Sequence, residues 1–191
     1  MNPRAFLALT AALLCAPLAI AQHQAFNINP DSSTVAFTLE SGHDTTNGTF
    51  HVEKGVVNFD ATSPNLSGLI VVSAASGNTG NASRDKKMLG DVLQATKFAD
   101  VTFVPQTYTG MLAPTGDSTL QVTGIFTLHG APHTITVPML LHVDGAKLTA
   151  KTTFKVPYVE WGLKDPSWFV LKVAKEVDVN LTLIGFLSPK S

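Results

Sequence analysis

Short runs of alternating apolar and polar residues, separated by turn signals, constrain the fold of this chain more than any other feature. In the first run, Val35, Phe37 and Leu39 alternate with threonine and alanine. Similar runs recur along the chain and predict about nine or ten strands. They cover residues 34–39, 50–52, 56–59, 69–72, 101–104, 120–128, 135–137, 141–143, 148–154 and 177–183. The alternation predicts antiparallel sheets with one apolar face.

Two all-β architectures fit this pattern, a sandwich and a closed barrel, because both give each strand one apolar face. A barrel of about eight strands is the size at which the interior can hold one small ligand. Asn47 and Gly48 predict a tight hairpin turn, and residues 129–132 predict another. Gly124, inside an apolar run, predicts a bulge or a bend.

Residues 79–103 depart from the strand pattern and predict one short helix. Gly80 and Asn81 form a turn, and Ser83 is placed to cap a helix with Asp85 in its first turn. The apolar face of this helix is expected to carry Met88, Leu89, Val92, Leu93 and Thr96. An alternating strand then begins with Val101 and Phe103.

The first residues have the features of a secretory signal. Arg4 precedes an apolar stretch over residues 5–20, and residues 19–21 have the small-x-small form of a cleavage site. We therefore expect residues 1–21 to be a cleaved signal peptide and residues 22–191 to form a single domain; an uncleaved anchor is the alternative. The only cysteine, Cys15, follows Leu14, where lipoprotein anchoring would need a small residue. The mature chain then has no cysteine and folds without disulfides.

The charge of the chain argues against nucleic acid as a partner. Removing Arg4 from the 13 basic residues leaves 12 against 14 acidic residues, a formal charge of −2. No basic run is present, whereas phosphate backbones require clustered lysine and arginine. No further membrane span is expected after removal of the signal peptide.

The order of residues in 79–103 resembles the YceI-like family of polyisoprenoid-binding proteins. The resemblance rests on Thr-Gly-Asn-x-x-Arg-Asp at residues 79–85, a short helix, and Lys-Phe-x-x-x-Thr-Phe at residues 97–103. Three further stretches, 29–37, 122–130 and 176–183, are similar to the family in the same order, and residues 158–167 look like a variant of a family loop. Ser32 stands where the family usually has histidine.

This resemblance implies an extended, lipocalin-like antiparallel β-barrel that holds an amphiphile in an apolar tunnel. It also implies a periplasmic or secreted location, a homodimer, and an isoprenoid quinone, prenyl phosphate or other long-chain lipid as ligand. We expect no catalysis, no cofactor and no metal. The residues expected to line the tunnel are Phe37, Phe50, Phe103, Phe126, Leu128, Phe154 and Trp161. The alternative is an interaction module in which the same side chains fill a solid core.

A polar head group needs donors at the tunnel mouth, and Asn81, Arg84 and Asp85 are the candidates. Arg84 can offer its fork of donors to a phosphate or a quinone oxygen. The structural alternative is that Asp85 supports the start of the helix and pairs with Arg84.

An envelope hydrolase is the remaining alternative. Glu160 and Asp165 lie near Trp161 and Trp168, and a pair of carboxylates beside aromatic rings is typical of glycosidases. Such an enzyme would use Glu160 with Asp165 or His129. The histidines do not predict a metal site, because Gly130 and Pro132 separate His129 from His133, and His43 and His51 flank the expected hairpin turn.

Overall fold

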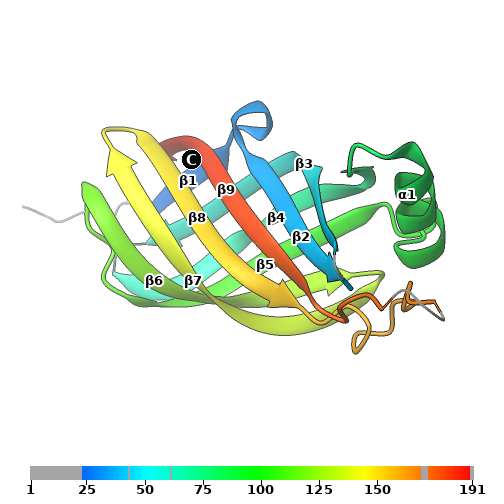
Figure 1. Ribbon diagram of the computed structural model, residues 1–191. Helices are drawn as coiled ribbons and strands as arrows, with labels where there is room; N and C mark the ends of the chain where they lie inside the picture. Colours follow the sequence, from blue (N-terminus) through cyan, green and yellow to red (C-terminus); the bar gives the residue numbers. More distant parts are fainter. Residues whose placement is uncertain (1–22, 43, 61, 169–171, 190–191) are drawn as a thin grey trace, which may run out of the picture.

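Nine antiparallel strands and one short helical segment make up this fold (Figure 1). The computed structural model describes residues 23–42, 44–60, 62–168 and 172–189, so the predicted signal peptide and His43 lie outside the described residues. The strands are β1 (His23–Ile28), β2 (Thr34–Ser41), β3 (Asp44–Asp60), β4 (Ser63–Asn78), β5 (Asp100–Gly110), β6 (Gly116–Leu128), β7 (Ala131–Asp144), β8 (Lys147–Val156) and β9 (Val177–Pro189). Helix α1 (Ala82–Lys87) continues directly into a π-helical turn, η2 (Met88–Val92), and a short 3₁₀ turn, η1 (Pro30–Ser32), follows β1.

The sheet closes into a barrel, which decides between the two architectures that the sequence allowed. Strands β2 to β9 each pair with the next strand along the chain, and β2 also pairs with β9. The closed barrel therefore has eight strands, as predicted, and no free edge between them.

Strand β1, which the sequence pattern did not reveal, is the additional ninth strand. It pairs with the end of β3 over residues 56–60 and with the end of β9 over residues 185–189. Strand β2 pairs with the opposite ends of the same two strands. The 3₁₀ turn at Pro30 lies between them, so β1 and β2 fill one position in the barrel wall, one after the other.

The predicted hairpin turn at Asn47 and Gly48 is wrong, because both residues lie inside β3. The turn comes earlier, where Ser41 pairs with Asp44, and Gly42 there has a φ of 56°. Gly48 is needed for another reason: a Cβ atom at this position would lie 2.4 Å from Cζ of Phe37. This glycine allows an aromatic ring to rest on the strand, and no turn is required.

The predicted turn after residue 128 is confirmed. His129 and Gly130 have φ angles of 53° and 76°, and they join Leu128 to its partner Ala131 in a two-residue hairpin. Positive φ at both central residues is the geometry that tight hairpins favour, since its twist matches that of the strands.

The bulge predicted at Gly124 lies on the neighbouring strand. The register between β5 and β6 shifts between Pro105 and Thr107, opposite Gly124 and Thr123. At Gly124, a Cβ atom would lie 2.6 Å from Cζ of Phe103, so the missing side chain makes room for that ring.

The helical segment is present but differs from the prediction at both ends. Its N-cap is Asn81, whose side chain accepts from the backbone N–H of Arg84 at 3.0 Å, and Ser83 lies inside the helix. The segment ends at Val92, and Gln94, with a φ of 48°, turns the chain away. Thr96 is therefore exposed and outside the helix.

The helical segment lies at one end of the barrel. Figure 1 places the described parts of the connection between β8 and β9, residues 157–168 and 172–176, at the same end, drawn in orange. This end is called the helical end below. Within the described ranges, no helix is long and apolar enough to cross a membrane.

Candidate functional site

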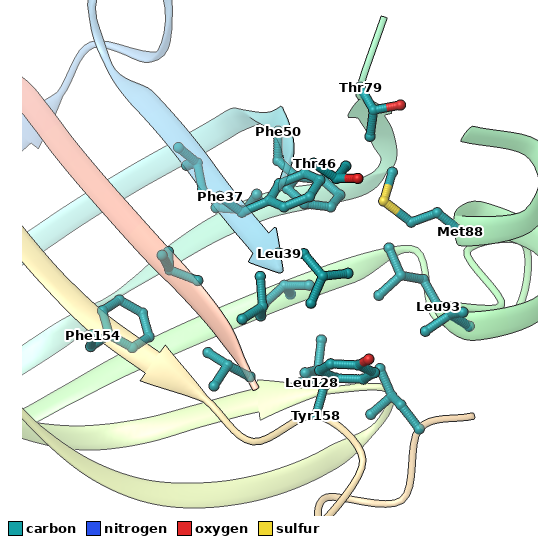
Figure 2. Close-up of a pocket in the computed structure, with 18 of the residues that line it drawn as sticks. Phe37, Leu39, Thr46, Phe50, Thr79, Met88, Leu93, Leu128, Phe154 and Tyr158 are labelled. Carbon is teal, nitrogen blue, oxygen red and sulfur yellow. The ribbon is translucent and has the colours of Figure 1, made fainter. Parts of the chain in front are cut away.

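The barrel encloses a cavity of about 650 Å³ at its helical end, called the main cavity below. Figure 2 shows Phe37, Leu39 and Leu128 directed into it, with Met88 and Leu93 reaching in from the helical segment. Six of the seven predicted tunnel residues line this cavity: Phe37, Phe50, Phe103, Phe126, Leu128 and Phe154. A cavity of this size is in the usual range for small-molecule sites, so the alternative of a solid core is wrong.

Aromatic pairs stiffen the cavity wall. The rings of Phe37 and Phe50 lie 5.3 Å apart between β2 and β3, and those of Phe126 and Phe154 lie 6.0 Å apart with an edge-to-face tilt of 79°. Both separations are typical of favourable aromatic contacts. The wall is therefore apolar and held by contacts within the protein.

Trp161, the seventh predicted residue, does not line the main cavity. Its indole stacks on the imidazole of His133 at 3.9 Å and lies 5.8 Å from the ring of Phe126. Trp161 thus stands behind Phe126 and supports the wall from the side of the β8–β9 connection.

The helical segment covers one side of the mouth with apolar side chains. Met88, Val92 and Leu93 all line the cavity. The segment approaches the barrel closely at Gly77, where a Cβ atom would lie 2.7 Å from both Cε of Met88 and Cε1 of Phe50. A larger residue at position 77 would push the segment outward.

Arg84 forms the polar corner of the mouth, together with two threonines. Its Nη1 donates to Oγ1 of Thr46 at 3.0 Å, and its Nε donates to Oγ1 of Thr79 at 3.0 Å. Thr46 is buried, so β3 provides a fixed acceptor for the guanidinium. Arg84 also lines the main cavity, as does Lys87 on the same helix, so two cations lie at the edge of an apolar space.

Asp85 orders this corner indirectly. Its carboxylate accepts from both the backbone N–H and the hydroxyl of Thr79, at 2.9 Å and 2.6 Å. Arg84 and Asp85 are both described, and no ion pair joins them, so the salt-bridge alternative is not formed. Asn81 lines the cavity and also caps the helix, whereas Asp85 does not line the cavity.

The β8–β9 connection is fixed against the barrel at the opposite side of the mouth. The hydroxyl of Tyr158 donates to the carbonyl of Ala174 at 2.7 Å, and the N–H of Ala174 donates to the carbonyl of Glu40 at 2.8 Å. Burial, with a smaller contribution from the Asp165 carboxylate, raises the pKa of Tyr158 to about 12. The phenol therefore stays neutral at physiological pH and acts as a structural donor.

The candidate carboxylates of a hydrolase do not have the environment of a catalytic pair. Asp165 accepts from the backbone N–H of Ser167 at 2.8 Å, and hydrogen bonds from Ser167 lower its pKa. Glu160 is exposed, and the ring of His129 packs 4.1 Å from Phe98. A lowered pKa does not suit a general acid, so the surroundings of Asp165 do not support that role.

A comparison with protein families agrees with the architecture. The profile of the YceI-like domain matches residues 26–184, which include β2 to β8 completely and β9 as far as Ile184. The chain belongs to the YceI-like family. The family resemblance inferred from residues 79–103 is thereby confirmed.

Relatives and solved structures extend this result. A UPF0312 protein of Pseudomonas syringae pv. tomato is 33% identical over 192 aligned positions that cover 95% of each chain. The crystal structure of BcnA from Burkholderia cenocepacia has a TM-score of 0.68 at 22% identity, covering 83% of this chain and 99% of that one. A domain from Saccharophagus degradans, described as polyisoprenoid binding, has a TM-score of 0.64 at 14% identity, covering 86% and 98%. At these identities the two structures support the shared fold.

Sequence reasoning missed the residues that hold Arg84 and those that narrow the mouth. Thr46 was not identified because a turn was predicted incorrectly at residues 47–48. In a continuous strand, Thr46 lies on the same inward face as Phe50, four residues further along. Tyr158 also lines the cavity. In the sequence it was notable only as the first residue of the family-like loop at residues 158–167. No pattern in the sequence indicated that Thr79 would accept from Arg84.

Proposed function

We propose that this protein is an exported, non-enzymatic binding protein that holds the chain of an isoprenoid-type amphiphile in the main cavity, for transport, storage or sequestration. The observation that carries the proposal is an open apolar space of about 650 Å³ inside a closed barrel. Burying about 400 Å² of hydrocarbon would contribute about 10 kcal/mol before ordering costs. That is enough to hold a chain that is poorly soluble in water.

Arg84 is proposed to bind the head group, with Asn81 beside it. A guanidinium has five N–H donors, and Thr46 and Thr79 occupy only part of that set. Within the described residues no carboxylate pairs with Arg84. The remaining donors suit a phosphate or a carbonyl oxygen, and Asp85 contributes by fixing Thr79.

The location is part of the proposal. The signal-like residues 1–21 support export to the periplasm or beyond. The mass of the protein recovered from a bacterial host tests this, since cleavage after Ala21 leaves Gln22 as the first residue. A recovered protein that still begins at Met1 contradicts the proposed cleavage of residues 1–21.

The lipid itself is tested by extraction and titration. The purified protein is extracted into organic solvent, the extract is examined by mass spectrometry, and the delipidated protein is titrated with a prenyl phosphate and an isoprenoid quinone. We expect a co-purified long-chain lipid and saturable binding. An empty extract together with no binding of either compound would refute the proposal.

The head-group assignment has a separate test. Arg84→Gln should weaken binding of a prenyl phosphate about tenfold, while binding of the uncharged prenol of equal length changes little. Lys86→Gln is the matched control, because Lys86 is an exposed cation on the same helix that does not line the cavity. Equal losses for phosphate and prenol would remove Arg84 from the head-group site.

A further inference from the structure

Thr152 is the one polar residue on the inward face of β8, a strand that is described in full. Along that face it alternates with Leu148, Ala150, Phe154 and Val156. Thr152 is only 6% exposed and lines the main cavity. A second cavity, of about 500 Å³, occupies the other half of the barrel interior, but Thr152 does not line it. This threonine therefore belongs to the wall of the main cavity.

The hydroxyl of Thr152 is buried and has no hydrogen-bond partner among the described residues. Leu181 pairs with Thr152 on the same face, and Ala150 and Phe154 flank it along the strand. A water molecule needs about two to four polar partners, and these side chains provide none. A buried hydroxyl without a partner costs free energy, and valine has nearly the same shape without that cost. Folding therefore does not account for a threonine at this position.

Thr152 lies deep inside the mouth of the cavity. The strand register places it at the level of Phe50, because consecutive residue pairs across β9 and β2 join the two. Thr46, which accepts from Arg84, precedes Phe50 by four residues on β3, which is about 13 Å toward the mouth at about 3.3 Å per residue. The hydroxyl is therefore remote from the proposed head-group site and faces the hydrocarbon part of a bound ligand.

The side chain of Thr152 can present its hydroxyl to a ligand without losing a hydrogen bond. Rotation about the Cα–Cβ bond, from one staggered rotamer to another, moves the hydroxyl into the position of the methyl group. The hydroxyl has no bond within the described residues that would oppose this rotation. Because a threonine hydroxyl can both donate and accept, its partner can be a carbonyl or a hydroxyl oxygen.

We propose that Thr152 binds an oxygen atom within the hydrocarbon part of the ligand, a carbonyl or hydroxyl group about 13 Å from the head group. This inference rests on the proposed function and narrows the ligand to amphiphiles that carry a second polar group along the chain. A chain oxygen at another apolar depth loses its hydrogen bonds to water and gains none, so it weakens binding. An oxygen at the depth of Thr152 is compensated by the hydroxyl.

A scan of ketone positions tests this inference. Saturated polyprenyl phosphates of one length carry a single ketone at successive positions, and the ketone-free phosphate is the parent compound. Calorimetric titration of the unmodified protein should show the tightest ketone binding at one position inside the chain, at least about fivefold tighter than at positions several carbons away. Thr152→Val should weaken binding of that ketone at least about fivefold more than binding of the parent.

Infrared spectroscopy gives a readout that packing alone would not change. The carbonyl band of the bound ketone should lie at lower frequency in the unmodified protein than in Thr152→Val, because a hydrogen bond weakens the C=O bond. Thr153→Val is the matched control, since Thr153 is exposed on the outer face of β8 and its hydroxyl donates to Oδ1 of Asn180 at 2.7 Å. This control should change neither the ketone scan nor the carbonyl band.

The outcomes separate this inference from the proposed function. If the parent phosphate binds but the scan shows no maximum, or if the maximum persists in Thr152→Val, the inference is wrong and the proposed function stands. Equal losses for ketone and parent, or a clearly lower melting temperature of Thr152→Val, would show a structural role for the hydroxyl and also overturn the inference. If neither the parent phosphate nor the corresponding prenol binds, the proposed function is wrong and the inference is wrong with it.

Discussion

The hydrogen bond between Arg84 and Thr46 ties the helical segment to β3, and a double-mutant cycle measures it. Nη1 of Arg84 donates to Oγ1 of Thr46 at 3.0 Å, and Thr46 is only 8% exposed. A hydrogen bond to a charged group contributes about 1.5–3 kcal/mol, and the lower value applies here because Arg84 is partly exposed to solvent. Thr46→Val should thus lower the free energy of unfolding by about 1.5 kcal/mol.

Arg84→Met keeps the packing of the aliphatic part of the side chain and removes all of the guanidinium donors. It should therefore lower the free energy of unfolding by about 2 kcal/mol. Because both substitutions remove the same hydrogen bond, the free energy of unfolding of the double variant should be only slightly lower than that of Arg84→Met alone. The coupling energy is then about 1–1.5 kcal/mol. Urea unfolding of the four proteins, followed by circular dichroism, gives these values.

A neighbouring threonine gives the control cycle. Thr45 is exposed, and its hydroxyl donates to the carboxylate of Glu40 at 3.0 Å, away from Arg84. Thr45→Val combined with Arg84→Met should be additive. If Thr46→Val with Arg84→Met is also additive to within about 0.5 kcal/mol, the bond does not hold the helical segment and the reasoning above is wrong.

Three further predictions follow from single positions. Gly48→Ala should lower the free energy of unfolding by about 1–3 kcal/mol and weaken lipid binding, since the new Cβ pushes the ring of Phe37 toward the main cavity. An unchanged free energy of unfolding and unchanged lipid binding would contradict the close contact. Gly90→Ala has no atom within 4 Å of the new Cβ and lies in the helical segment, so it should raise the free energy of unfolding by up to about 1 kcal/mol, and a loss would contradict this. The folded pKa of Tyr158 is raised to about 12 from 10.0, so stability present below pH 10 should fall as the pH rises from about 10 to 12. Tyr158→Phe should remove that pH dependence. It should also lower the free energy of unfolding by about 1 kcal/mol, because the hydrogen bond to Ala174 is lost. An unaltered pH profile in the variant would show that another group causes the pH dependence.

Most of the fold could be read from local patterns. Alternation along a strand shows which residues share a face, and it identified Phe37, Phe126 and Leu128 correctly as inward-facing. The predicted hairpin turn at Asn47 and Gly48 was wrong, because an Asn-Gly pair is compatible both with a turn and with an aromatic ring packed on a strand. Only contact with Phe37, which comes from another strand, separates the two.

The helical segment shows the same limit. Its existence was predicted from the spacing of apolar residues, but the π-helical turn at Met88–Val92 changes the number of residues per turn. Leu93 bonds back to the carbonyl of Met88, five residues earlier, so an ordinary helical spacing no longer places Thr96 on the apolar face. The α-helical spacing of apolar residues in the sequence does not indicate where a π-helical turn will form.

By itself, the sequence determined that the chain forms antiparallel strands with one apolar face, one short helical segment and a family signature in residues 79–103. These are local properties, set by side chains a few residues apart. The tertiary structure alone decided that β2 meets β9 to close a barrel, and that the enclosed side chains leave two cavities unfilled. Closure and volume depend on residues far apart in the chain, and the same apolar faces could equally have packed against one another in a sandwich.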